Sequence, residues 1–166
     1  TETADGGVDA GPTEADAGDA SGCVDADGGT RTDETIAFDA ELLGPSGTGF
    51  RFCVRWTGPS DGYCFNVTTS ASGANPGSIQ ILKQTALGLV TLGTTTDLPI
   101  TMGTWHNYRL TIQGSCSVYL DAYLDGATTP TVGAMDDADP YPAGGLDMMT
   151  GNGVEMIDFR AAAHGG

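Results

Sequence analysis

Residues 105–126, WHNYRLTIQGSCSVYLDAYLDG, constrain the fold of this chain more than any other stretch. Apolar side chains alternate with polar ones along both halves of it: Tyr108, Leu110, Ile112, Val118, Leu120, Ala122 and Leu124. Successive side chains of a strand leave opposite faces of the sheet, so this period of two predicts two half-buried strands. Gln-Gly-Ser at 113–115 joins them, and Asp-Gly at 125–126 ends the second. The stretch predicts an antiparallel hairpin.

The rest of the chain repeats the pattern in short segments between Gly, Pro and Thr residues. We expect further strands at residues 36–42, 50–56, 63–68, 78–84, 87–92, 146–149 and 154–159. Residues 94–97 are expected to form a turn, and residues 128–131 with 136–142 a long acidic, proline-bearing loop. No stretch has helical periodicity of useful length. The predicted class is all-β, as an antiparallel two-sheet sandwich.

Short motifs on these strands carry a family resemblance. They are Gly103-Thr104-Trp105, Arg109-Leu110, Gly114, Val118-Tyr119-Leu120 and Asp125-Gly126, with the strands at 50–56 and 63–68, Gly144-Gly145-Leu146 and the closing strand at 154–160. Together they resemble the core of concanavalin A-like (laminin G-like) jelly-roll domains, over roughly residues 34–162. The resemblance implies a sandwich of the kind used for glycan binding, adhesion, spacing or, in some branches, polysaccharide cleavage.

The charge of the chain limits its partners. Its formal net charge is −16, from 22 acidic and six basic residues, and Lys83 is the single lysine. So few cations cannot neutralise a phosphate backbone, so we expect no nucleic-acid partner. An anionic membrane surface would repel the chain, and no apolar run approaches the ~20 residues of a membrane span.

The amino-terminal part differs from the rest, which suggests two regions. Residues 1–33 are expected to form an acidic, Gly/Ala/Asp-rich tail or linker, and residues 34–166 the sandwich domain. Residues 1–30 contain eight acids and no base, and only Val8 and Val24 are sizeable apolar residues. Such a segment buries too little apolar surface to offset the entropy of ordering it.

A faint calcium motif lies at the end of this tail. Asp25, Asp27, Asp33 and Glu34 resemble part of a D-x-D-x-D-G loop, but Gly29 stands where the third acid belongs. A solvated linker is the favoured interpretation. Calcium is left open as a cofactor, and no other cofactor is expected.

Four cysteines without any CxxC pair indicate disulfides and an oxidising compartment. In residues 50–56, Cys53 and Arg55 are expected to share one face with Arg51, and Trp56 the opposite face with Phe50. If residues 57–60 form the whole connection to the next strand, Cys53 faces Cys64. Elimination then pairs Cys23 with Cys116. We expect a secreted or cell-surface protein.

A catalytic site is not expected. Hydrolases built on this sandwich carry a Glu-x-Asp-x-x-Glu strand, because retaining hydrolysis needs two neighbouring carboxyl groups. None of the five glutamates lies in that pattern, and neither His106 nor His164 has a recognisable nucleophile partner. The sequence favours a protein that is not an enzyme.

The polar face of the second hairpin strand is the candidate ligand site. Tyr119, Asp121 and Tyr123 lie in a row there, and Arg55 or Arg109 could add hydrogen-bond donors. A sugar ring needs an apolar surface for stacking and acceptors for its hydroxyls, which this trio would supply. Tyrosines also favour exposed strand positions for reasons unrelated to any ligand.

Three hypotheses follow for the function. The first is a secreted or surface module that binds glycans or mediates adhesion. The second is a structural subunit whose copies assemble into a surface layer or extracellular filament. The third, an enzyme, is the least favoured because the carboxylate motif is absent. The expected partner is therefore a polysaccharide or glycan, or further copies of the same chain.

Overall fold

The computed structural model describes residues 33–43, 49–69, 77–114, 116–141, 144–150 and 154–164, with backbone alone for Asp33, 148–150 and 154–164. Its elements are β1 (Asp33–Leu42), β2 (Gly49–Gly58), β3 (Asp61–Thr69), β4 (Gly77–Thr85), β5 (Gly88–Leu98), β6 (Trp105–Gln113), β7 (Val118–Leu124), β8 (Val132–Asp136), β9 (Gly145–Thr150) and β10 (Val154–His164). Every element in these ranges is a strand. The predicted all-β class is confirmed.

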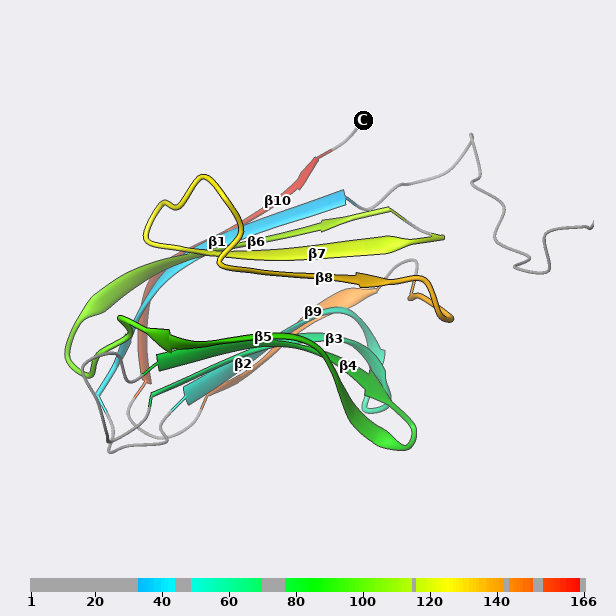
Figure 1. Cartoon of the computed structure of the whole chain (residues 1–166), viewed down its shortest axis with the longest axis horizontal. Helices are drawn as coiled ribbons and strands as arrows, with labels where there is room; N and C mark the ends of the chain where they lie inside the picture. The colour runs from blue at the N-terminus through cyan, green and yellow to red at the C-terminus, as the bar shows by residue number, and fades with distance from the viewer. Residues whose placement is uncertain are drawn as a thin grey trace, which may run out of the picture.

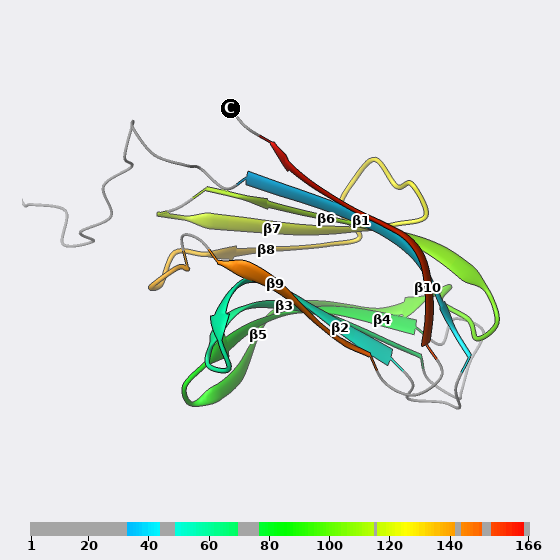
Figure 2. The same cartoon turned by 180° about the vertical axis from the view of Figure 1, so that it is seen from behind.

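The strands form two five-stranded antiparallel sheets that pack face to face (Figures 1 and 2). One sheet has the order β10-β1-β6-β7-β8, and the other β5-β4-β3-β2-β9. One edge of each sheet is formed by a late strand that pairs with an early one: β10 pairs with β1, and β9 with β2. The expected two-sheet sandwich is therefore present. The expected tail at residues 1–33 lies outside the described residues except for Asp33.

The core lies between the sheets and is built from the alternating apolar positions. Phe38 of β1 and Tyr108 of β6 stack with ring centroids 5.5 Å apart. Phe50 of β2 meets both rings edge-on, at 5.4 Å and 5.2 Å. Offset and edge-to-face arrangements are the favourable geometries for aromatic rings. This cluster joins the two layers.

The hairpin expected at residues 105–126 is confirmed. Leu110 pairs with Ala122 and Ile112 with Leu120, so the apolar positions of β6 and β7 share the buried face. Gly114 has a φ of +88°, and a Cβ there would lie 2.2 Å from the Ser117 carbonyl oxygen. Only glycine fits this turn, because other residues would be strained as well as clash.

Two loop predictions are wrong. Residues 94–97 belong to β5, where Thr94 and Thr95 pair with Gln80 and Ile79, because β-branched threonines suit an extended strand. The predicted acidic loop is interrupted by β8, whose Val132 pairs with Ala122 of β7. The short length of β8 hid its alternation in the sequence.

A bulge reverses the expected faces of Arg55 and Trp56. The register of β2 shifts after Val54, and Arg55 has a φ of +49°. A bulge adds one residue to a strand, so the following side chains change face. Trp56 consequently packs on the cluster formed by Cys53, Cys64 and Leu82, while the Arg55 side chain is fully buried. The alternation of side chains alone could not predict that Arg55 and Trp56 exchange faces of the sheet.

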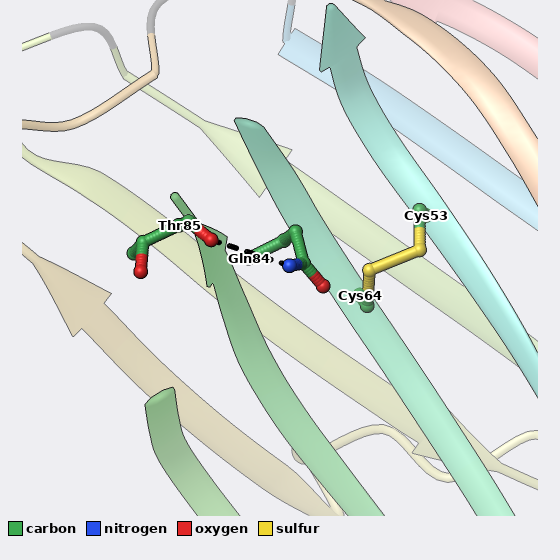
Figure 3. Close-up of a disulfide and its surroundings, with 4 residues drawn as sticks. All are labelled: Cys53, Cys64, Gln84 and Thr85. Carbon is green, nitrogen blue, oxygen red and sulfur yellow. Dashed lines mark hydrogen bonds between the residues drawn. A yellow bond between two sulfur atoms is a disulfide. The ribbon is translucent and has the colours of Figure 1, made fainter. Parts of the chain in front are cut away.

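The predicted Cys53–Cys64 disulfide is confirmed and links β2 to β3 (Figure 3). The two residues face each other across the strand pair with Cα atoms 4.0 Å apart. Gln84 and Thr85, on the neighbouring β4, are drawn beside the bridge in Figure 3. Cys23 lies outside the described residues, so its pairing with Cys116 stays a prediction.

Candidate functional site

A buried ion pair ties the two sheets together near the end of β4. Lys83 of β4 and Asp136, the last residue of β8, lie in different sheets, with Nζ 2.7 Å from Oδ2. Their side chains are only 10% and 4% exposed. Burying either charge alone would be costly, so each requires the other and further hydrogen bonds.

Lys83 also holds the segment that follows β8. Its ammonium donates to the carbonyl oxygens of Ala138 and Asp139, at 2.6 Å and 2.8 Å. With Asp136, these two carbonyls give the ammonium three acceptors, which equals its number of N–H donors. The single lysine of the chain is therefore fully engaged inside the protein.

Asp136 is satisfied from the other side. Its Oδ2 accepts a 2.7 Å hydrogen bond from the Tyr63 hydroxyl, and its Oδ1 accepts one from the Ala138 backbone N–H at 3.2 Å. Burial, followed by the hydrogen bond to Asp136, raises the pKa of Tyr63 above its ordinary value. The Tyr63 hydroxyl stays protonated and also accepts the Tyr141 N–H at 3.0 Å.

Tyr141 completes the anchoring of this segment. Its carbonyl accepts a 3.0 Å hydrogen bond from Arg55 Nη1, and its hydroxyl donates to the Gln84 carbonyl at 2.9 Å. The Lys83 Nζ lies 5.1 Å from the centre of its ring, which is within the range of a cation–π contact. Gly144, which follows this segment, lies directly against the backbone of Arg55, where a Cβ would be only 2.1 Å from the Arg55 carbonyl carbon.

An open pocket of about 600 Å³ lies between this segment and the β4–β5 hairpin. Both segments lie at the same end of the sandwich in Figures 1 and 2. The apolar part of the lining consists of Ala86, Leu87, Val90, Leu92 and Ala138. The polar part consists of Asp61, Lys83, Thr85, Asp136, Asp139 and Tyr141. The volume lies within the usual range of small-molecule sites.

The trio predicted from the sequence lies elsewhere, on the outer face of β7. Tyr119 is exposed, whereas Asp121 and Tyr123 are half-buried. Arg109 stacks on the Tyr123 ring at 3.9 Å and donates to the Ala127 carbonyl. Burial raises the pKa of Asp121 above its ordinary value. The structure brings Arg109, but not Arg55, to this face.

Sequence reasoning missed the pocket, although one signal was available. Lys83 alternates with Ile79 and Ile81, and therefore shares their buried face. A lysine at such a position requires a buried partner. Asp136 could not be recognised as that partner, because it falls in a segment predicted as a loop.

The ring of His106 is engaged within the protein. Its Nδ1 lies 2.8 Å from Asp125 Oδ2, and its Nε2 accepts the Thr101 N–H at 3.4 Å. Both ring nitrogens therefore have partners. In the described ranges no group of three or more His, Cys, Asp or Glu residues could hold a metal ion. Asp25 and Asp27 of the calcium motif lie outside those ranges, and no described helix could span a membrane.

Glu34 of β1 is half-buried, and the contacts of its carboxyl group do not fully offset the cost of burying its negative charge. Its Oε2 is buried and has no hydrogen-bond partner within the described part of the chain. Burial raises the pKa of its carboxyl above the ordinary 4.5, and the positive charge of Arg55 opposes this only in part. The ionised form of Glu34 is therefore less favourable in the folded state than in the unfolded chain.

Replacing Lys83 tests the anchoring of the pocket segment. Lys83→Met should lower the free energy of unfolding by about 3 kcal/mol or more, because it leaves the buried Asp136 charge uncompensated. Urea unfolding measures the loss. The double variant Lys83→Met/Asp136→Leu should recover part of it, since no lone charge remains. A double variant that loses the sum of both single losses would contradict this coupling.

The charge of Glu34 should make stability depend on pH. Protonated Glu34 makes its full contribution to the free energy of unfolding below pH 4.5, the ordinary pKa of the carboxyl group. This contribution is lost as the pH rises through the raised pKa of the folded state. Glu34→Gln should therefore be more stable than the parent at neutral pH and about equal to it below 4.5. Urea midpoints at the two pH values measure this. A variant that is less stable at neutral pH would show that the ionised carboxylate is stabilising.

Comparisons with known proteins show the fold alone. No family model and no curated protein sequence matches the chain. Similar solved structures include the carbohydrate-binding module CBM66 from Bacillus subtilis, at 16% identity, covering 80% of this chain and 76% of that one, with a TM-score of 0.61. Sheep galectin-11 in complex with glycerol has 9% identity and a TM-score of 0.57, and the match covers 80% of this chain and 92% of that one.

A third similar structure is part of a longer chain. A K247S mutant of the GH43 protein BlXynB from Bacillus licheniformis has 8% identity and a TM-score of 0.56. The match covers 80% of this chain but only 28% of that one. The fold of this chain is thus a β-sandwich of the type found in the carbohydrate-binding module CBM66 and in galectin-11, and also in part of the longer GH43 protein BlXynB.

Proposed function

We propose that this chain is a non-catalytic, extracellular glycan-binding module whose binding site is the pocket beside Tyr141. The pocket itself is the observation that carries the proposal. It combines an apolar wall, which includes Leu87 and Val90, with the carboxylates of Asp61 and Asp139. The C–H face of a sugar ring packs on apolar side chains, and its hydroxyls donate to carboxylate oxygens.

The anchored segment gives this pocket a defined shape. Lys83, Asp136, Tyr63 and Arg55 hold the backbone of residues 138–141 by direct hydrogen bonds. A binding surface that is already ordered loses less conformational entropy when a ligand binds. The arrangement therefore supports a preformed site.

Other features support the remaining parts of the proposal. The Cys53–Cys64 disulfide favours an oxidising, extracellular compartment. The likeness to CBM66, which is named a carbohydrate-binding module, favours glycan binding on this fold. Asp136 is engaged by Lys83 and Tyr63, so it is a poor candidate for the acid of a hydrolytic pair.

The alternative of a self-assembling structural subunit is supported by a different surface. Tyr119 of β7 and Met135 of β8 lie directly opposite each other and are 52% and 49% exposed. Neighbouring apolar side chains on an outer sheet face suit contact with another molecule. The two candidate functions therefore use different surfaces, which share no residue, and can be separated by mutation.

Filling the pocket tests the proposed function. The parent protein is screened on a glycan array, and its best ligand is titrated calorimetrically. Val90→Trp should lower that affinity by at least about tenfold, since the indole would fill the space beside the apolar wall in which the sugar ring would lie. Thr96→Trp, on the same strand but outside the pocket, is the matched control and should bind as the parent does.

Tyr119→Ala separates the alternatives in the same experiment. Glycan affinity that falls with Tyr119→Ala and not with Val90→Trp would move the site to the outer face of β7. Absence of glycan binding, combined with self-association of the parent that Tyr119→Ala abolishes in light scattering, would replace the proposed function by the structural one.

A further inference from the structure

We infer that the pocket beside Tyr141 selects neutral, hydroxyl-rich glycans and excludes glycans that carry carboxylate or sulfate groups. This inference rests on the proposed function and specifies its ligand class. It follows from which hydrogen-bonding groups of the lining are already used within the protein and which remain for a ligand.

The side-chain donors of the lining are consumed internally. The pocket-lining residues include three such donors: Lys83, Thr85 and Tyr141. The ammonium of Lys83 donates its N–H groups to Asp136 and to the carbonyl oxygens of Ala138 and Asp139. The Thr85 hydroxyl donates to the Gly88 carbonyl, and the Tyr141 hydroxyl to the Gln84 carbonyl.

Two nearby backbone donors are also engaged. The Leu87 N–H donates to Thr85 Oγ1, and the Ala138 N–H to Asp136 Oδ1. An anionic group on a ligand needs free donors or an available cation to replace its hydration shell. Lys83 cannot serve this purpose without releasing the buried Asp136.

Unlike the donors, two carboxylate acceptors of the lining can still accept hydrogen bonds from a ligand. Asp139 is exposed, and Asp61 is half-buried and also interacts with the Tyr141 hydroxyl; both carboxylates belong to the pocket lining and have further acceptor positions. Ionised carboxylates accept hydrogen bonds and donate none, so they favour hydroxyl groups of a ligand. They repel a second anion. The polar lining therefore recognises hydroxyl donors.

Charge balance acts in the same direction. The lining contains Asp61, Asp136 and Asp139 against Lys83, which is three negative charges against one positive, a net −2. The whole chain carries −16, so the long-range field also opposes an anionic ligand. Salt screens the exposed part of this repulsion within about 10 Å at 0.1 M.

Matched pairs of oligosaccharides test the selectivity. The probes are trisaccharides of mannose, galactose or glucose, each compared with the corresponding uronic acid trisaccharide, titrated against the full chain. We expect the neutral member of at least one pair to bind, and its uronate to bind at least about tenfold more weakly at about 0.02 M salt. The gap should narrow at about 0.5 M salt, where charges are screened.

A pair of isosteric variants shows whether the pocket causes the gap. Asp139→Asn should reduce the difference in affinity between the neutral and the uronate trisaccharide several-fold, because the amide supplies a hydrogen-bond donor and removes one negative charge. Asp97→Asn is the matched control: both aspartates are exposed and have positive φ values, 60° and 59°, which asparagine tolerates, but Asp97 lies outside the pocket.

The outcomes separate the inference from the proposed function. Equal affinity for neutral and uronate members, or an equal effect of Asp139→Asn and Asp97→Asn, would overturn the selectivity while leaving glycan binding intact. Absence of binding to every neutral probe and on the glycan array would overturn the proposed function, and the selectivity with it.

Discussion

The ion pair between Lys83 and Asp136 is the interaction on which the pocket end of this sandwich depends. It joins a strand of each sheet, and it also fixes the backbone of Ala138 and Asp139. A buried pair of this kind adds little net stability compared with apolar packing, because desolvation offsets the attraction. Its value here lies in position: it holds an irregular segment in one conformation beside an open pocket.

That conformation determines what the pocket offers to a ligand. The donors of Lys83 and Tyr141 are turned inward to hold the segment, and the carboxylates of Asp61 and Asp139 remain at the pocket. The lining's side-chain donors thus hold the segment, whereas the carboxylates of Asp61 and Asp139 face the pocket. The proposed preference for hydroxyl-rich ligands is a consequence of how the segment is anchored.

The fold followed from the sequence where alternation was long and regular. The β6–β7 hairpin and the Cys53–Cys64 bridge were predicted because register fixes which side chains face each other. Arg55 was placed on the wrong face, since a bulge leaves no mark in the pattern. The pocket was missed because Lys83 and Asp136 are 53 positions apart and meet only when the sheets pack.

Hydrogen exchange of the unaltered protein tests the central claim most directly. The claim is that residues 138–141 are held by buried partners, although the segment has no regular secondary structure. The amides of Ala138 and Tyr141, which donate to Asp136 and Tyr63, should exchange as slowly as amides in the strand interior of β4. Exchange at the rate of a freely solvated loop would show that the Lys83–Asp136 pair does not order the segment.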